Sequence, residues 1–218
     1  MCFSATASFG AGAVLGVIGT VSITTAKTGS AKLFGSIPLI FAIQQITEGL
    51  LWLSLKDSGL AEWRSLLTYI YLIFAMAIWP FWIPFTIRLL EKDTKLKKMI
   101  GRLLVTGIFV AIAVILVLCL YPVTVVPMKH HLHYEFGFSA TAKNLIIPFT
   151  VLYIAATVAT SLISGIKRIK WLGAAFLVSY IAAAIFYNGF VLSVWCFFAA
   201  ILSFIVLLVI LKLPKHPL

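Results

Sequence analysis

The sequence predicts an all-α integral membrane protein, a single domain over residues 1–218 built as a bundle of seven transmembrane helices. Of the 218 residues, 62% are hydrophobic and only 11% are charged, whereas soluble domains are about half apolar and roughly one quarter charged. The apolar residues fall into seven continuous runs, each near the roughly 20 residues that cross a bilayer. The runs do not alternate with period two, so helices are preferred to barrel strands.

The predicted spans follow one another with short connections, except for one longer loop at 122–143. They cover residues 5–26, 33–55, 64–88, 99–121, 144–165, 171–188 and 190–212. No basic residue precedes Lys27, so the first span lacks the features of a signal peptide and is expected to be retained. A turn at 187–189 (Tyr-Asn-Gly) joins the last two spans.

Prolines and tryptophans refine this picture. Pro80 and Pro84 remove two backbone donors one turn apart, which predicts a kink in the third span. Pro38 and Pro148 predict bends in the second and fifth spans. Three tryptophans stand near predicted span ends, as interfacial aromatic residues do: Trp52, Trp63 and Trp171.

The basic residues predict the orientation of the bundle. Of the 17 Lys and Arg residues, 13 fall in the loops 27–32, 88–102 and 166–170 and in the C-terminal tail, and four fall on the other side. Short cytoplasmic loops collect Lys and Arg, so we expect the N-terminus outside and the C-terminus in the cytoplasm. The formal charge of +11 is therefore read as a topology signal and a contact with anionic lipid, and nucleic acid is not an expected partner.

Two sequence patterns concern helix packing. The segment Phe-Ser-Ala-Thr-Ala at 3–7 recurs at 138–142, each time before a span that runs inward. This recurrence predicts parallel repeats over 1–90 and 136–213, with 99–121 as a linker helix. The alternative is that the five residues recur by chance, because the composition is strongly biased toward a few residue types. In the first span, small residues recur at every fourth position and predict close helix packing: Ser4, Ser8, Gly12, Gly16, Thr20 and Thr24.

Glu48 is the only acidic residue predicted to lie within the hydrocarbon layer. Gln44 and Gln45 precede it by four and three residues, so the three side chains share one helix face. Asn188, in a similar place after the sixth span, is a possible counterpart in the repeat and joins the candidate binding residues, with Cys196. Two interpretations stay open: a ligand site in the outer half of the bundle, or a structural polar core in which a protonated Glu48 is satisfied by glutamine and backbone groups.

Cysteine and histidine residues suggest a second kind of site. Cys2 and Cys196 are predicted to lie in the outer part of the protein, and the 122–143 loop contains His130, His131 and His133. Thiolate and imidazole ligands together suit Zn or Cu, although the spacing matches no zinc motif and a solvated loop is the alternative. Cys2 and Cys196 could instead form a disulfide in an oxidising compartment, or Cys2 could act as a catalytic nucleophile with a nearby histidine as base.

Four segments together resemble an uncharacterised family of small bacterial membrane proteins. They are the opening Met-Cys-Phe-Ser-Ala, the pattern Gln-Gln-x-x-Glu-Gly-x-x-Trp at 44–52, the pair Trp79-Pro80, and Ser-Val-Trp-Cys-Phe-Phe-Ala-Ala at 193–200. The resemblance spans nearly the whole chain. It implies a bacterial cytoplasmic membrane and a similar number of helices, and it implies no activity.

The sequence therefore favours small-molecule binding or transport through a polar pocket around Glu48. The alternatives are an extracytoplasmic Cys/His metal or redox site, an enzyme that uses Cys2, and a structural subunit that needs no site. Whether the chain is an enzyme is left open.

Overall fold

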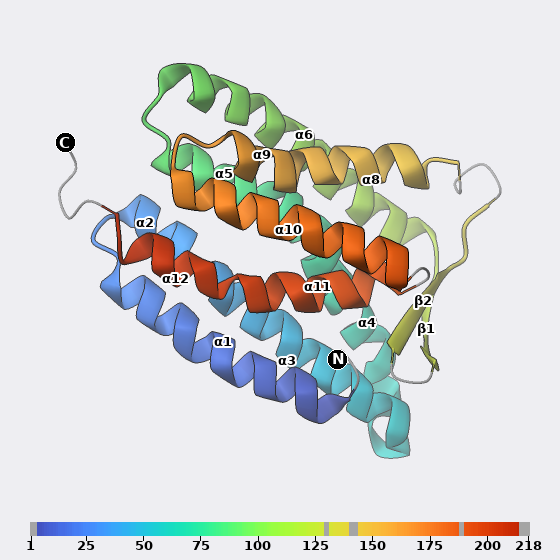
Figure 1. Cartoon of the computed structure of the whole chain (residues 1–218). Coiled ribbons are helices and arrows are strands. Elements are labelled where there is room, and N and C mark those ends of the chain that lie inside the picture. The colour runs from blue at the N-terminus through green and yellow to red at the C-terminus, as the bar shows by residue number, and fades with distance from the viewer. Residues whose placement is uncertain (1–3, 129–130, 140–143, 188–189, 214–218) are drawn as a thin grey trace.

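Long helical spans lie side by side in the structure, a computed structural model, and a two-stranded hairpin closes one end of the bundle (Figure 1). The structure describes residues 4–128, 131–139, 144–187 and 190–213. Seven helices in this part of the chain are long and apolar enough to cross a membrane, which confirms the predicted number: Ala5–Thr25, Gly29–Lys56, Ser58–Leu90, Thr94–Leu120, Ile146–Ile163, Lys167–Phe186 and Val191–Ile210.

The first two spans form a closely packed pair. Helix α1 (Ala5–Thr25) begins at Ser4, whose hydroxyl accepts the backbone N–H of Ala7. The second span is divided into α2 (Gly29–Gly35) and α3 (Ile37–Lys56). The break falls at Ser36, just before Pro38 in the first turn of α3. Pro38 therefore marks a break where the sequence predicted a bend.

The contact between α1 and α3 corrects the predicted stripe of small residues. The buried face of α1 consists of Ser8, Gly12, Leu15, Gly19 and Ser22. An α-helix has 3.6 residues per turn, so residues spaced by four rotate gradually around the helix. The predicted stripe therefore turns away from α3, and Thr20 and Thr24 at its end are exposed. Helices α1 and α3 come closest at Gly19, where an added Cβ would lie 2.6 Å from the backbone nitrogen of Leu39.

The third span is interrupted ahead of its prolines. It comprises the 3-10 helix η1 (Ser58–Trp63), α4 (Arg64–Leu72), the π-helical segment η2 (Ile73–Ile78) and α5 (Trp79–Leu90). Pro80 stands in the first turn of α5 and Pro84 in its interior. Because Pro84 has no N–H, the carbonyl of Pro80 lacks the donor that an ordinary helix would supply.

Helix α6 (Thr94–Leu120) crosses α5 where that carbonyl is located. The carbonyl oxygen of Pro80 lies directly against Gly107 of α6, in the space that a Cβ would occupy. Small residues at such crossings let two backbones approach within a membrane. Gly107 therefore sets the distance between the third and fourth spans.

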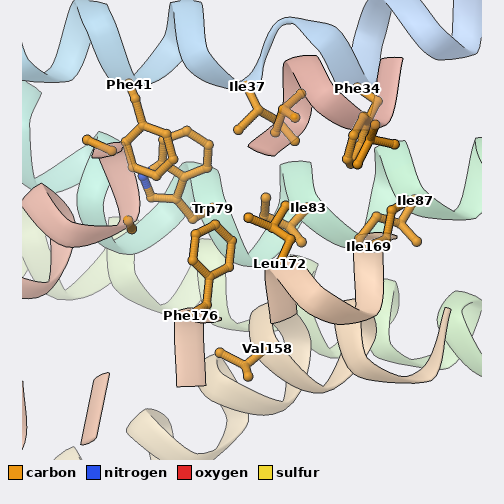
Figure 2. Packing of buried hydrophobic residues seen from close by; sticks show 14 of the residues in the cluster. Phe34, Ile37, Phe41, Trp79, Ile83, Ile87, Val158, Ile169, Leu172 and Phe176 are labelled. Atoms are coloured by element: carbon orange, nitrogen blue, oxygen red, sulfur yellow. The ribbon is translucent and has the colours of Figure 1, made fainter. Parts of the chain in front are cut away.

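The remaining spans complete the bundle around α3 and α5. The fifth comprises α8 (Ile146–Ile154), the π-helical segment η3 (Ala155–Ala159) and α9 (Thr160–Ile163). The sixth is α10 (Lys167–Phe186), and the seventh is α11 (Val191–Leu202) followed by α12 (Phe204–Ile210). Figure 2 shows the core, in which side chains of α2 and α3 face those of α5 and α10.

The hairpin replaces most of the loop that the sequence predicted at 122–143. Strand β1 (Val123–Met128) pairs antiparallel with β2 (His131–Phe136), and Val125 stands opposite Tyr134. Leu132 and Tyr134 are buried, and the Tyr134 ring stacks on Tyr71 of α4 with ring centroids 5.3 Å apart. The hairpin thus covers the end of the bundle, which we call the hairpin end.

The connections rich in Lys and Arg gather at the opposite end, which we call the basic end (Figure 1). Trp63 at the hairpin end and Trp171 at the basic end are exposed, whereas Trp52 is buried, which corrects its interpretation as an interfacial residue. The orientation across the membrane, the bacterial inner membrane as location, and the internal repeat stay predictions.

Candidate functional site

Polar side chains from three spans meet in the half of the bundle nearer the hairpin end. They form what we call the polar cluster: Ser8, Gln44, Gln45, Glu48, Ser193 and Cys196. Gln44, Gln45 and Glu48 are fully buried on one face of α3, as their spacing predicted. Glu48 lies eight residues before the end of α3, about 12 Å along the axis.

Glu48 is held between α1 and α11. The hydroxyl of Ser193 donates to Glu48 Oε1 at 2.8 Å. Ser8 and Gln45 also lie near the Glu48 carboxyl, although none of their side-chain atoms forms a hydrogen bond of ordinary length and angle with it. A carboxyl group at this depth is costly to bury and in membrane proteins usually marks a functional site or a polar pairing.

Trp79 fixes the orientation of Gln44. Its indole Nε1–H donates to Gln44 Oε1 at 2.8 Å. An indole nitrogen can only donate, so the amide atom that faces it must be the oxygen. The amide nitrogen of Gln44 is thereby turned toward the rest of the cluster, where the Cys196 thiol is a neighbour.

Several buried atoms of the cluster have no hydrogen-bond partner among the described residues. They are Ser8 Oγ, Gln44 Nε2, Gln45 Oε1, Gln45 Nε2 and Glu48 Oε2. A buried polar group without a partner costs about 1–3 kcal/mol in proteins, and native structures hold few of them. The cluster therefore presents hydrogen-bond donors and acceptors side by side, an arrangement that suits a ligand with both kinds of group.

A small cavity adjoins the polar cluster on the side of the basic end. Its volume is about 30 Å³, room for about two water molecules. Aromatic rings form most of its wall, together with the Cys196 thiol: Phe41, Trp79, Tyr153, Phe176 and Trp195. Phe41 and Trp79 stack with centroids 3.8 Å apart, and Figure 2 shows Phe176 pointing toward them. Trp79 and Cys196 thus stand where the apolar cavity meets the polar cluster.

Two π-helical segments flank the cavity. Trp79 follows η2 directly, and Thr157, which lines the cavity, belongs to η3. The hydroxyl of Tyr153 donates to the carbonyl of Ala75 at 2.8 Å and so joins the fifth span to η2. Segments of π-helix occur often at functional sites.

We expect Tyr153→Phe to lower the free energy of unfolding by about 1 kcal/mol, because the Ala75 carbonyl loses a buried partner. Thermal or denaturant unfolding in detergent measures this. Tyr180→Phe is the control, since Tyr180 also packs on Trp195, and we expect it to change little. An equal loss in both variants would contradict a specific role for the hydroxyl that binds Ala75.

Of the predicted metal ligands, the structure describes His131, His133 and Cys196, and only Cys196 belongs to the polar cluster. Cys2, His130 and Asn188 lie outside the described residues. The ring of His131 stacks on Phe190 with centroids 4.8 Å apart, and His133 meets the edge of the same ring. Across residues 4–128, 131–139, 144–187 and 190–213, no group of three His, Cys, Asp or Glu could hold a metal ion. The zinc or copper site therefore stays a prediction.

The cysteines differ in their surroundings. Cys196 is a buried free thiol and Cys119 an exposed one. The pairing of Cys196 with Cys2 and the proposed nucleophile Cys2 both depend on a residue outside the described part of the chain.

Sequence reasoning missed three members of this site. The sequence patterns place Ser8 in a packing stripe, Trp79 in a kinked helix and Ser193 in a motif, and none of these patterns points to a polar site. The helical spacing on α3 predicted that Gln44, Gln45 and Glu48 share one face. No local pattern indicates that Ser193 binds the Glu48 carboxyl, 145 positions away. That contact arises from tertiary packing alone.

The fold and the polar cluster define a polytopic membrane protein with seven apolar helices and a buried polar site. The chain belongs to a family of unknown function, DUF6629, whose model matches residues 1–216. No curated protein and no solved structure gives a significant match.

Proposed function

We propose that the protein binds a small molecule in the polar cluster. The observation that carries this proposal is the set of fully buried donor and acceptor atoms on Gln44, Gln45 and Glu48 without partners among the described residues. Small-molecule sites place a few convergent polar groups beside apolar and aromatic walls. The aromatic cavity next to Trp79 supplies such a wall.

Each side chain has a role in this proposal. Glu48 accepts hydrogen bonds from the ligand through Oε2, while Ser193 holds Oε1. Gln45 offers both a donor and an acceptor. Gln44, oriented by Trp79, offers a donor. The site thus suits a molecule with both kinds of group within a few ångströms of each other.

Transport is the second candidate, and the interrupted spans favour it. The cavity of about 30 Å³ is far below the roughly 300–1,000 Å³ of sites that hold drug-sized ligands. A larger ligand therefore needs movement of the surrounding helices. The third and fifth spans carry π-helical segments beside the cavity, and in the third span Pro80 and Pro84 adjoin the lining residues Trp79 and Ile83. Such interruptions give helices places to bend.

The test is a screen of polar metabolites for thermal stabilisation of the purified protein. We expect at least one compound to raise the unfolding temperature of the wild type, and Glu48→Gln to lose most of that increase, because the amide replaces one acceptor by a donor. The matched control is Glu62→Gln, which removes a carboxylate exposed at the same end. It should respond like the wild type.

Two results would contradict the proposal. One is a library that stabilises no variant, and the other is a compound that stabilises Glu48→Gln as strongly as the wild type. Uptake of the same compound into proteoliposomes then distinguishes binding alone from transport. Uptake that is unchanged in Glu48→Gln would exclude Glu48 from a transport mechanism.

A further inference from the structure

An apolar groove runs between the first and seventh spans on the outside of the bundle. Its volume is about 540 Å³, within the roughly 300–1,000 Å³ typical of ligand sites. One wall is α1, from Ala7 to Ile18, and the other is formed by Phe197, Ile201 and Phe204 of α11 and α12. These helices belong to membrane spans, so hydrocarbon rather than water faces the groove.

The length of the groove matches one leaflet of a bilayer. Ala7 and Ile18 are eleven residues apart, which corresponds to about 16 Å of helix, and half of the hydrocarbon core is about 15 Å. Helix α1 starts at Ala5, at the hairpin end. The groove therefore extends from the hairpin end toward the middle of the membrane, as a lipid chain in that leaflet does.

The polar cluster lies behind the hairpin end of the groove. Ser8 is the neighbour of Ala7 but faces inward, and Ser193 stands one helical turn before Phe197 on the same face of α11. These two hydroxyls flank Glu48, since Ser193 donates to its Oε1 and Ser8 is a polar neighbour of its carboxyl. Ser8 Oγ and Glu48 Oε2 are buried without a partner among the described residues.

We propose that the groove and the cluster together bind a single-chain amphiphile from the leaflet at the hairpin end. The hydrocarbon chain lies between α1 and α11–α12. Ser8, Ser193 and Glu48 are fully buried, so the head group reaches Glu48 when the side chains at the hairpin end of the groove move apart. A carboxyl without a Lys or Arg partner in the described part of the chain, next to a hydroxyl and an amide, selects a head that donates hydrogen bonds and carries no negative charge. The expected class is a long-chain alcohol or amine. This inference rests on the proposed function, because the head group occupies the same cluster.

The experiment uses three photoreactive probes of equal chain length: dodecylamine, dodecanol and dodecanoic acid, each with a diazirine in mid-chain. The full-length protein in lipid nanodiscs is irradiated, and the adducts are mapped by mass spectrometry. We expect amine and alcohol adducts on both walls of the groove, and about tenfold fewer adducts from the acid, a difference of about 1.4 kcal/mol.

Matched variants localise the signal. Ala11→Trp places a large ring in the groove and should reduce the amine adducts about tenfold. Val17→Trp adds a ring of the same size on the exposed face of α1, outside the groove, and should leave the yield unchanged. Glu48→Gln should remove the preference for amine and alcohol over acid while the chain still labels the groove.

Three outcomes would overturn the inference. Equal labelling by all three probes would mean ordinary lipid contact, and loss of labelling in Val17→Trp as well as Ala11→Trp would mean that the groove is not the site. Oxidative crosslinking of two copies through an Ala11→Cys substitution, beyond the level seen in the wild type, would mean that a second chain fills the groove. If water-soluble compounds nevertheless stabilise the wild type and not Glu48→Gln, the proposed function stands and only the inference of amphiphile binding is rejected.

Discussion

Gly107→Ala is expected to destabilise the protein by about 3 kcal/mol, near the upper end of overpacking effects. The added methyl group would occupy the position of the Pro80 carbonyl oxygen in α5. Backbone cannot move aside as a flexible side chain can, so α5 and α6 must separate along their crossing. The separation also displaces Trp79, which precedes Pro80 and holds Gln44.

Denaturant or thermal unfolding of the purified protein in one detergent measures this effect. The control is Gly16→Ala on α1, where a Cβ would meet nothing within 4 Å. Alanine favours a helix over glycine by about 1 kcal/mol, so the control should be neutral or slightly more stable. Gly107→Ala with unchanged stability would show that the two helices are not in contact at this point.

Glu91→Ala is expected to destabilise the basic end by about 3 kcal/mol, because several hydrogen bonds to one carboxylate are lost together. Glu91 follows α5 and is buried. Its Oε1 accepts the backbone N–H groups of Lys92 and Asp93, and its Oε2 accepts the Gly165 N–H at 2.7 Å and the Ser164 hydroxyl at 3.3 Å. The side chain thus ties the connection before α6 to the connection before α10.

Unfolding experiments with a graded set of variants check this prediction. Ser164→Ala removes one of the four hydrogen bonds and should have a smaller effect than Glu91→Ala. Glu91→Gln keeps the shape of the side chain but turns one acceptor into a donor. Its loss of unfolding free energy should lie between those of Ser164→Ala and Glu91→Ala. Glu62→Ala, at an exposed carboxylate, is the control and should change little. A loss for Glu62→Ala as large as that for Glu91→Ala would contradict the specific role of the buried side chain.

The sequence could predict the spans because hydropathy alone decides which segments a bilayer accepts. The face shared by Gln44, Gln45 and Glu48 followed from helix periodicity. The hairpin was missed although its strands carry a usable signal, since apolar Leu132 and Tyr134 alternate with polar neighbours. The alternate positions of this strand are occupied by His131 and His133, and such residues point equally well to metal binding.

Long-range contacts account for the rest of what could not be predicted. Glu91 lies among basic residues and reads as an exposed loop acid. Its burial depends on Gly165, 74 positions later, where a Cβ would come within 2.8 Å of Glu91 Oε1. The orientation of Gln44 depends likewise on Trp79, 35 positions away. Neither pairing has a local pattern that a single sequence displays.

The π-helical segment η2 gives the third span a way to turn a side chain without unfolding. A π turn holds one residue more than an α turn, and one residue corresponds to about 100° of rotation and 1.5 Å of rise. Trp79 is the next residue after η2. If the wider turn migrated past Trp79, the indole would rotate away from Gln44 and their hydrogen bond would break. The aromatic cavity and the amide groups would then be connected, while the two ends of the span kept their positions.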